Sequence, residues 1–396
     1  MGMALQEILS EALRRNGTDI HLGAGLRPML RVDGDLVTMS GFDTSSNEDI
    51  RAVIGEVLTR KQIEDFEENF EIDFSFSYTG SAEETSRFRG NCFYERGNLC
   101  VALRTIPTKI KTIKDLKLPG PIVEVTKKHR GLFLVTGPTG SGKTTTLYAA
   151  LNRLNSLDRK ILTIEDPIEY QLKGITQMQV QPKIGFDFGM GLRAMLRHDP
   201  DIMLVGEIRD YETAEMAIRS SLTGHLVLST LHTNDAAGAV TRLIDMGVEP
   251  FLISSTMIAS IAQRLLRRVC AACARPDPPE ERVLHDEFGV DLSAYQSVNF
   301  QKGIGCDQCR HTGYRGRIAS YEMLPFSAAV KDLTVQRANA LQIKRKALEE
   351  GMVTLRQSGW RRVCEGMSTI EEVLRVTADA EVMGAPSETG DAAISI

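Results

Sequence analysis

The stretch LFLVTGPTGSGKTT, residues 132–145, carries the strongest structural signal in the chain. Its second part fits the pattern G-x-x-x-x-G-K-[ST] between an apolar run and a helical pattern, which is the context that a phosphate-binding loop requires. Glycines let successive backbone N–H groups point at phosphate oxygens, and the start of the following helix adds positive potential. We therefore predict a nucleotide site at these residues: Gly137, Pro138, Thr139, Gly140, Ser141, Gly142, Lys143, Thr144 and Thr145.

Two side chains of this loop have specific tasks in the prediction. Lys143 is expected to reach the β- and γ-phosphates, and Thr144 to ligate Mg²⁺. The alternative is a glycine-rich turn between a strand and a helix that holds no ligand. The complete pattern in its strand-to-helix context favours the nucleotide site.

Short apolar runs alternate with helical patterns from Gly131 onward. The runs cover residues 132–136, 160–164, 202–205 and 226–230. Runs this short, separated by helices, indicate a mostly parallel sheet that is buried on both faces, so the fold class is α/β. Because ligands bind outside the carboxyl ends of such strands, polar residues that follow the runs are candidates for the site.

Glu207 follows the run 202–205, where a P-loop fold holds a carboxylate that binds Mg²⁺ or orients the attacking water. Gly206 occupies the position directly after the run, where an aspartate is usual, so Glu207 is the predicted general base. The alternative is that Glu207 only pairs with Arg209 or another basic side chain.

Two further polar groups end predicted strands. The acidic stretch 165–169 contains Glu165 and Glu169, which we expect to face the nucleotide; the alternative is that they are solvated loop carboxylates. His225 and His232 bracket the run 226–230. A polar residue after such a strand can sense the γ-phosphate, which makes His232 a candidate, although a lone histidine is more often structural.

The residues before the phosphate loop show a different, α+β pattern. Helical segments at 5–13 and 47–69 and strands within 20–37 and at 72–76 precede a hairpin, which joins 87–94 to 99–106.

A turn at Arg96-Gly97 in this hairpin places Arg89 directly opposite Arg104. Like charges in a cross-strand pair are destabilising unless an anion lies between them, and a triphosphate is such an anion. The alternative is that both arginines are splayed into solvent.

The patterns also divide the chain. We expect an N-terminal domain at residues 1–106, a linker and hinge at 107–125 with three prolines and one glycine, and the nucleotide-binding domain at 126–377. Residues 378–396 are small and polar and are expected to form a loose tail.

Four of the seven cysteines form two C-x-x-C pairs, Cys270/Cys273 and Cys306/Cys309. Two such pairs deliver the four soft ligands of a tetrahedral Zn²⁺ site, so we predict a structural zinc element over residues 270–309.

Composition excludes several classes of protein. The 396 residues carry 47 Lys+Arg and 52 Asp+Glu, a formal net charge of −5, with 42% hydrophobic and 25% charged residues. This is a globular composition, which excludes a mainly disordered chain, and its acidic balance argues against coating of nucleic acid. No apolar run reaches the length of about 18 residues that a membrane helix needs, and Glu7 and Glu11 interrupt any secretory signal, so we expect a cytoplasmic protein without direct membrane insertion.

Four elements occur in one order: the phosphate loop and the stretches 163–169, 204–210 and 224–232. Together they resemble the Walker A loop, Asp box, atypical Walker B and His box of the secretion ATPase superfamily, the motor ATPases of type II secretion and type IV pili. The resemblance extends over nearly the whole chain.

The resemblance implies a RecA-like domain in a homo-hexameric ring that hydrolyses ATP with Mg²⁺. Such rings push or pull the platform protein of a filament and meet the inner membrane only through partners. Arginines of the N-terminal domain complete the site in this family. The residues that match its catalytic positions are Lys143, Glu165, Glu169, Glu207, His232, Arg89 and Arg104.

The direction of work is divided between two branches. The tetracysteine element and the stretches 351–355 and 366–377 resemble pilus-assembly and secretion ATPases, whereas 18–22 and 87–107 resemble retraction ATPases. Assembly ATPases usually carry a further N-terminal docking domain, so we expect either a short form or a chain without that domain.

Other classes fit less well. A GTPase would need an N-K-x-D element, which the chain lacks, and a small-molecule kinase would need a lid that the layout does not suggest. A hexameric nucleic-acid motor is disfavoured by the acidic balance and the single tryptophan. A binding module with a decayed ATPase is disfavoured by intact Lys143, Thr144 and Glu207.

Overall fold

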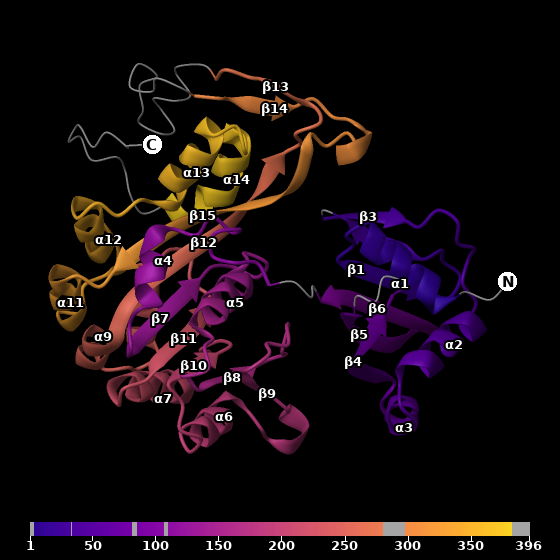
Figure 1. Cartoon of the computed structure of the whole chain (residues 1–396), viewed down its shortest axis with the longest axis horizontal. Helices are drawn as coiled ribbons and strands as arrows, with labels where there is room; N and C mark the ends of the chain where they lie inside the picture. The colour runs from indigo at the N-terminus through magenta and orange to yellow at the C-terminus, as the bar shows by residue number, and fades with distance from the viewer. Residues whose placement is uncertain (1–3, 33, 81–84, 107–109, 280–297, 382–396) are drawn as a thin grey trace. The chain divides into compact units, whose positions relative to one another are not determined.

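The computed structural model describes residues 4–32, 34–80, 85–106, 110–279 and 298–381. Contacts divide the chain into two compact units, Met1–Lys109 and Ile110–Ile396, which we call unit 1 and unit 2 (Figure 1).

Unit 1 is an antiparallel sheet with helices packed on one face. The strand order is β3-β2-β1-β6-β5-β4. Phe88 and Cys92 of β5 are buried against the helices, whereas Arg87 and Arg89, which alternate with them, are only half-buried. This alternation is typical of an antiparallel sheet with one covered face. The elements are α1 (Leu5–Arg14), β1 (Asp19–Gly23), β2 (Met29–Val32), β3 (Asp35–Thr38), α2 (Asn47–Val57), α3 (Arg60–Asn69), β4 (Glu71–Thr79), β5 (Thr85–Glu95) and β6 (Asn98–Ile106).

The predicted helical segment at 47–69 is two helices. α2 ends at Val57, and Thr59 begins α3 with a capping box in which its side chain accepts from the Gln62 N–H and the Gln62 side chain accepts from the Thr59 N–H. Because a threonine followed three residues later by glutamine starts a helix, this local signal overrides the continuous helical periodicity.

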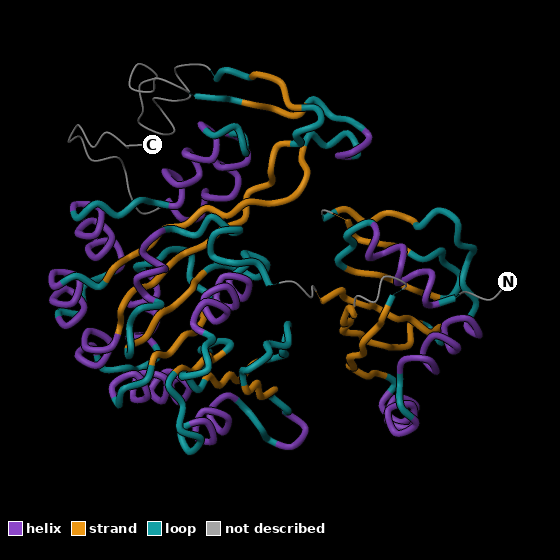
Figure 2. Tube along the Cα trace, in the orientation of Figure 1, coloured by secondary structure: helices purple, strands orange, loops and turns teal. Residues whose placement is uncertain are grey.

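Unit 2 is built on a mostly parallel sheet with the order β15-β12-β7-β11-β10-β8-β9. Leu132 and Leu134 of β7 face one apolar core, and Phe133 and Val135 face another. The sheet is therefore buried on both faces, as the short apolar runs predicted, and helices lie along it (Figure 2). The elements are β7 (Gly131–Thr136), α5 (Lys143–Leu154), β8 (Ile161–Glu165), β9 (Thr176–Gln179), η1 (Pro182–Ile184), α6 (Phe188–Met195), β10 (Ile202–Val205), α7 (Tyr211–Leu222), β11 (Leu226–Leu231), α8 (Gly238–Asp245) and α9 (Pro250–Thr256).

Most of the expected linker belongs to unit 2. Ile122 and Val125 of α4 (Gly120–Val125), together with Leu118, are buried in the core of that unit. The structure therefore differs from the expected linker at 107–125, because residues 110–125 belong to unit 2. Proline at the start of α4 was read as a loop signal, but proline is also well suited to the first turn of a helix.

A long antiparallel ribbon leads from the sheet to the cysteine pairs. β12 (Met257–Val269) pairs with β7 on one side and with β15 (Tyr314–Pro325) on the other. Arg267 of β12 is fixed to α14 (Ile370–Glu381) by an ion pair of 2.9 Å with Glu372. The remaining elements are β13 (Ala274–Pro276), β14 (Gln301–Gly303), η3 (Asp307–Cys309), α11 (Ala328–Val335), α12 (Ala340–Glu349) and α13 (Leu355–Cys364).

The C-terminal helices form a small core of their own. Trp360 of α13, the single tryptophan, is buried there, with its ring centroid 5.7 Å from that of Phe300. α14 continues to Glu381, so the expected tail does not begin at residue 378, and residues 382–396 lie outside the described residues. In the described parts of the chain, no helix is both long and apolar enough to cross a membrane.

Candidate functional site

Four parallel strands of unit 2 bring the predicted residues to one edge of the sheet. β7, β8, β10 and β11 pair in parallel, so their carboxyl ends lie at the same edge. The phosphate loop follows β7, Glu165 ends β8, Glu207 follows β10 and His232 follows β11. Sequence reasoning placed each of them correctly at a strand end.

The phosphate loop has the backbone that its glycines predict. Gly137 and Gly142 have φ of 142° and 87°, values at which a side chain would be strained. Residues 138–140 are exposed, and so is Thr144, the predicted Mg²⁺ ligand. The Ser141 hydroxyl is buried without a hydrogen-bond partner among the described residues, so an acceptor such as a phosphate oxygen fits this loop.

Lys143 is the first residue of α5, and its side chain folds back over the phosphate loop. Its Nζ donates to the carbonyl oxygens of Gly137 at 2.7 Å and Pro138 at 3.0 Å. Burial lowers the pKa of the ammonium group, the nearby Arg264 guanidinium lowers it further, and the Glu207 carboxylate opposes both. The lysine, Glu207 and Arg264 therefore share one electrostatic environment.

Glu207 is held between two basic side chains. Its Oε2 lies 3.0 Å from Nε2 of His232, and its Oε1 pairs with Arg209. The alternative that Glu207 pairs with Arg209 thus holds in this structure, together with the expected proximity to His232. A carboxyl group within hydrogen-bond distance of a histidine is an arrangement suited to proton transfer.

Glu165 differs from the expectation that it faces the nucleotide. Only 3% of it is exposed, and both oxygens accept from protein side chains. Oε1 accepts from the Thr163 hydroxyl at 2.6 Å and from Gln177 at 3.1 Å, and Oε2 accepts from the Tyr148 hydroxyl. Burial raises the pKa of the carboxyl group against these donors. The geometry favours a role for Glu165 in holding α5 to β8; Glu169 is half-buried beside it.

His225 has a structural place. Its Nδ1 lies 2.8 Å from the Ser220 carbonyl oxygen at the end of α7, at the opposite end of β11 from His232. The two histidines that the sequence placed together therefore serve different purposes.

The arginine pair of unit 1 has the predicted register. Arg89 lies opposite Arg104, and Arg104 lies opposite Asp19 on β1. Arg104 donates to Asp19 at 2.7 Å. Burial alone would raise the pKa of Asp19, but the hydrogen bonds from Arg104 and Thr18 outweigh it, so the pKa is lowered. A carboxylate of the same unit thus supplies an anion to Arg104, whereas the structure shows no ion pair for Arg89 among the described residues.

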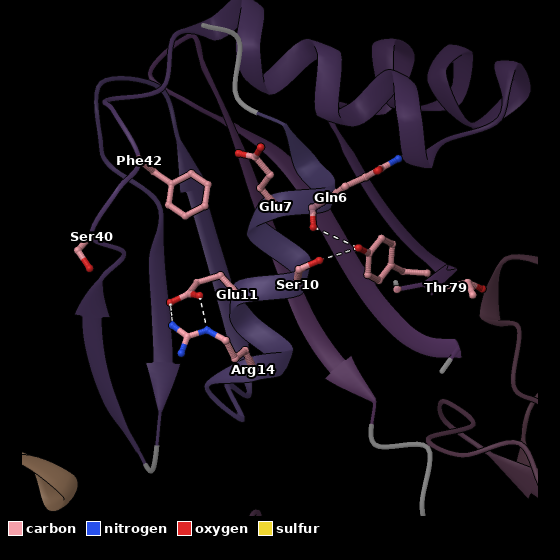
Figure 3. Close-up of a pocket in the computed structure, with 10 residues that line it drawn as sticks. Gln6, Glu7, Ser10, Glu11, Arg14, Ser40, Phe42 and Thr79 are labelled. Atoms are coloured by element: carbon pink, nitrogen blue, oxygen red, sulfur yellow. Dashed lines mark hydrogen bonds and ion pairs between the residues drawn. The ribbon is translucent and has the colours of Figure 1, made fainter. Parts of the chain in front are cut away.

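A cavity of about 890 Å³ opens in unit 1 beside α1 and the end of β4 (Figure 3). Its polar side chains interact with one another: Arg14 donates to Glu11, and the Ser10 hydroxyl lies 2.7 Å from that of Tyr78. It belongs to a unit that does not carry the phosphate loop, and we assign it no part in the nucleotide site.

The two cysteine pairs come together as predicted. The Sγ atoms of Cys270 and Cys306 are 3.9 Å apart, and those of Cys273 and Cys309 are 3.7 Å apart. Zn–S bonds of about 2.3 Å in a tetrahedron require sulfur separations of about 3.8 Å, so this cluster can hold a metal ion. His311 lies apart, 3.3 Å from Asp307. Residues 280–297 of the predicted zinc element lie outside the described residues.

Sequence reasoning missed three buried residues with polar groups, Tyr148, Gln263 and Arg264, which carry no local motif. Tyr148 bonds to Glu165. Gln263 and Arg264 lie in a stretch of mostly apolar residues on β12, and the pairing of β12 with β7 reveals that these two adjoin the phosphate loop.

A family model described as "Type II/IV secretion system protein" matches residues 3–375. The chain belongs to this family. Over 387 residues it is 42% identical to type II secretion system protein E of Pseudomonas aeruginosa, covering 95% of this chain and 75% of that protein. It is 39% identical to the type IV pilus assembly ATPase PilB of Thermus thermophilus, covering 95% of this chain and 43% of the relative. The chain spans about half of the length of several other relatives that it matches.

The likeness extends to solved structures of the secretion family and its neighbours. The crystal structure of the pilus retraction motor PilT with bound ADP superposes with a TM-score of 0.74 at 31% identity, covering 94% of this chain and 96% of that one. This confirms the predicted fold class: α/β, with an α+β first unit and a RecA-like second unit that carries the four-cysteine cluster and the C-terminal helices.

The four-cysteine cluster generates a prediction about metal content. We expect about one zinc ion per chain, because four thiolates complete a tetrahedral shell. Cys273→Ser should lower the zinc content of the purified protein to a small fraction of that value, measured by inductively coupled plasma mass spectrometry. Cys100→Ser, which changes a cysteine of unit 1, is the matched control and should retain the metal. Full zinc content in Cys273→Ser would contradict the assignment.

Proposed function

We propose that this chain is a Mg²⁺-dependent ATPase that drives the assembly of a type IV pilus or a type II secretion pseudopilus. The observation that carries the proposal is the meeting of Lys143, Glu207 and His232 beside an open phosphate loop. The names of the relatives, type II secretion protein E and a pilus assembly ATPase, support the kind of machine.

The residues of the site divide the work. Lys143 leaves the Gly137 and Pro138 carbonyl oxygens to bind the β- and γ-phosphates, and the exposed Thr144 hydroxyl ligates Mg²⁺, which offsets phosphate charge. Glu207 accepts a proton from the attacking water, and His232, which holds the same carboxylate at 3.0 Å, orients it toward the γ-phosphate. Glu165 and Glu169 support the site from the end of β8.

The proteins similar to this chain include a pilus assembly ATPase and a pilus retraction motor, so two directions of work are candidates. The four-cysteine cluster and the pilus-assembly and secretion relatives favour assembly. Pilus retraction is the second candidate function, because the structure of the pilus retraction motor PilT covers nearly the whole of this chain. A hexameric nucleic-acid motor is a third, weaker candidate, with nothing in the charge balance to favour it.

The surroundings of the enzyme follow from the same proposal. A homo-hexamer acts in the cytoplasm on a platform protein of the inner membrane and reaches the membrane through that partner rather than by insertion. It has no role in nucleic-acid binding. The structure contributes one supporting fact, that no described helix can cross a membrane.

Arg89 and Arg104 act on the nucleotide from the N-terminal domain in this proposal. Arg104 forms an ion pair with Asp19, whereas Arg89 shows no ion pair among the described residues. The Arg89 guanidinium therefore has no described carboxylate partner to exchange before it contacts a phosphate. A phosphate group would relieve the repulsion between the two guanidinium groups.

The catalytic carboxylate can be tested directly. Glu207→Gln removes the proton acceptor but keeps the shape of the side chain, so ATP turnover should fall by a factor of about 100 or more while ATP binding stays within about twofold. Phosphate release measures the first and a fluorescent ATP analogue the second. Glu249→Gln, at an exposed carboxylate, should change neither value. Steady hydrolysis by Glu207→Gln would disprove the assignment.

The arginine role makes a second prediction. Arg89→Ala should lower turnover about tenfold or more with little change in nucleotide affinity, because the charge is needed where negative charge develops on the γ-phosphate. Arg104→Ala should do the same. Arg87→Ala, on the same face of β5, serves as the control. Unchanged turnover in both variants would remove the role.

The direction of work is decided in cells whose chromosomal copy of the gene carries Lys143→Ala. We expect either cells without surface pili or normal pili with secreted enzymes trapped inside, measured by electron microscopy and an enzyme assay on the same culture. Excess pili would overturn assembly and assign retraction. Normal pili with normal secretion would overturn both. Lys127→Ala, a surface change, is the control.

A further inference from the structure

Two consecutive polar residues of β12 lie buried against the phosphate loop. Ala262 pairs with Thr136, the last residue of β7, so Gln263 and Arg264 adjoin the loop that follows. Gln263 is 2% exposed and Arg264 is 5% exposed. Buried polar groups are costly unless they are hydrogen-bonded, so their bonds indicate what keeps them there.

The Gln263 amide joins the last part of the phosphate loop to helix α5. Its Nε2 donates to the carbonyl oxygen of Ser141 at 2.8 Å, and its Oε1 accepts from the hydroxyl of Thr146 at 2.7 Å. A Cβ atom on Gly142 would lie 2.7 Å from this Nε2. The amide therefore fills the space that the glycine leaves and fixes the loop to the first turn of α5.

Arg264 reaches in the other direction. Its Nη2 donates to the carbonyl oxygen of Asn234 at 2.9 Å, and its Nη1 to the carbonyl oxygen of Gln263 at 3.2 Å. Asn234 follows His232 by two residues. The guanidinium thus holds the segment that leaves the His232 position, while its charge acts on Lys143 across the loop.

A hydrophobic pair would be the simpler choice for a strand buried in a sheet. A leucine at each position would avoid the desolvation of an amide and a guanidinium. The Gln263 side chain instead bonds to the phosphate loop and to α5. The Arg264 guanidinium bonds to the Asn234 carbonyl oxygen in the segment that follows His232 and to the Gln263 carbonyl oxygen of its own strand.

We propose that Gln263 and Arg264 are positioning residues for ATP hydrolysis: Gln263 sets the phosphate loop in its binding geometry, and Arg264 sets the segment of His232 relative to that loop. This rests on the proposed ATPase function. The two residues act through different elements, so their kinetic effects are distinct.

Gln263→Leu should weaken ATP and ADP binding equally, by roughly tenfold, because the loop contacts the phosphates that both nucleotides share and loses a buried hydrogen bond at each end. Arg264→Gln should lower kcat about tenfold with KM within about twofold, because the segment of His232 matters for hydrolysis rather than for binding. Arg264→Lys should restore part of the rate, since it retains a buried charge and one donor.

The experiment measures ATP and ADP affinity with a fluorescent analogue, and kcat and KM by phosphate release, for the full chain. Arg268→Gln, an exposed arginine of the same strand, is the matched control and should change none of these values. Circular dichroism and the thermal midpoint show whether each variant is folded.

A double-mutant cycle with Thr146→Val separates positioning from loss of stability. If Gln263 acts through Thr146, Gln263→Leu should change affinity less in the Thr146→Val background than in the wild type. Additive effects, or folded Gln263→Leu protein with ADP affinity within twofold of the wild type, would overturn the role of Gln263. An unchanged kcat in Arg264→Gln would overturn that of Arg264. A wild-type chain that binds ADP but does not hydrolyse ATP would instead refute the proposed function, and the ADP measurements would still test Gln263.

Discussion

Parallel strands that are covered on both faces leave one place where polar side chains of different strands can meet, the edge where the strands end. In unit 2 this constraint governs everything around the phosphate loop. β7, β10 and β11 are buried along their whole length, and the candidate residues Lys143, Glu207 and His232 lie in the segments that follow them. Lys143, Glu207 and His232 come from segments far apart in the sequence, and the order of the parallel strands brings these segments to one edge of the sheet.

The charged side chains at this edge contact other groups of the protein. Lys143 is held by carbonyl oxygens, and Glu207 is held by Arg209 and His232. Lys143 is buried, so these carbonyl contacts satisfy hydrogen bonds that its ammonium group would otherwise lose on leaving water. In unit 1, Asp19 likewise contacts Arg104.

Sequence reasoning succeeded where spacing along the chain determines the feature. It failed where the feature depends on contacts between elements that are distant in the sequence. The spacing of glycines and lysine in the loop, the two C-x-x-C pairs and the hairpin register of Arg89 and Arg104 follow from distances along the chain, and all three appear in the structure. Glu165 ends its strand where it was expected, but its surroundings come from Tyr148 and Gln177, on other elements. Gln263 and Arg264 were not predicted, because they reach the phosphate loop only through the pairing of β12 with β7. The predicted linker extends into unit 2, because proline both favours loops and occurs in the first turn of helices such as α4.

The burial of Trp360 has a practical consequence for spectroscopy. The chain has one tryptophan, and it packs in the core of the C-terminal helices of unit 2. Its emission therefore reports on unit 2 alone, and the whole of unit 1 is silent at excitation wavelengths selective for tryptophan. An unfolding curve recorded in this way describes one unit and not the other. The melting of the arginine-bearing sheet must be followed by a different signal, such as amide hydrogen exchange, before a single transition is taken to describe the protein.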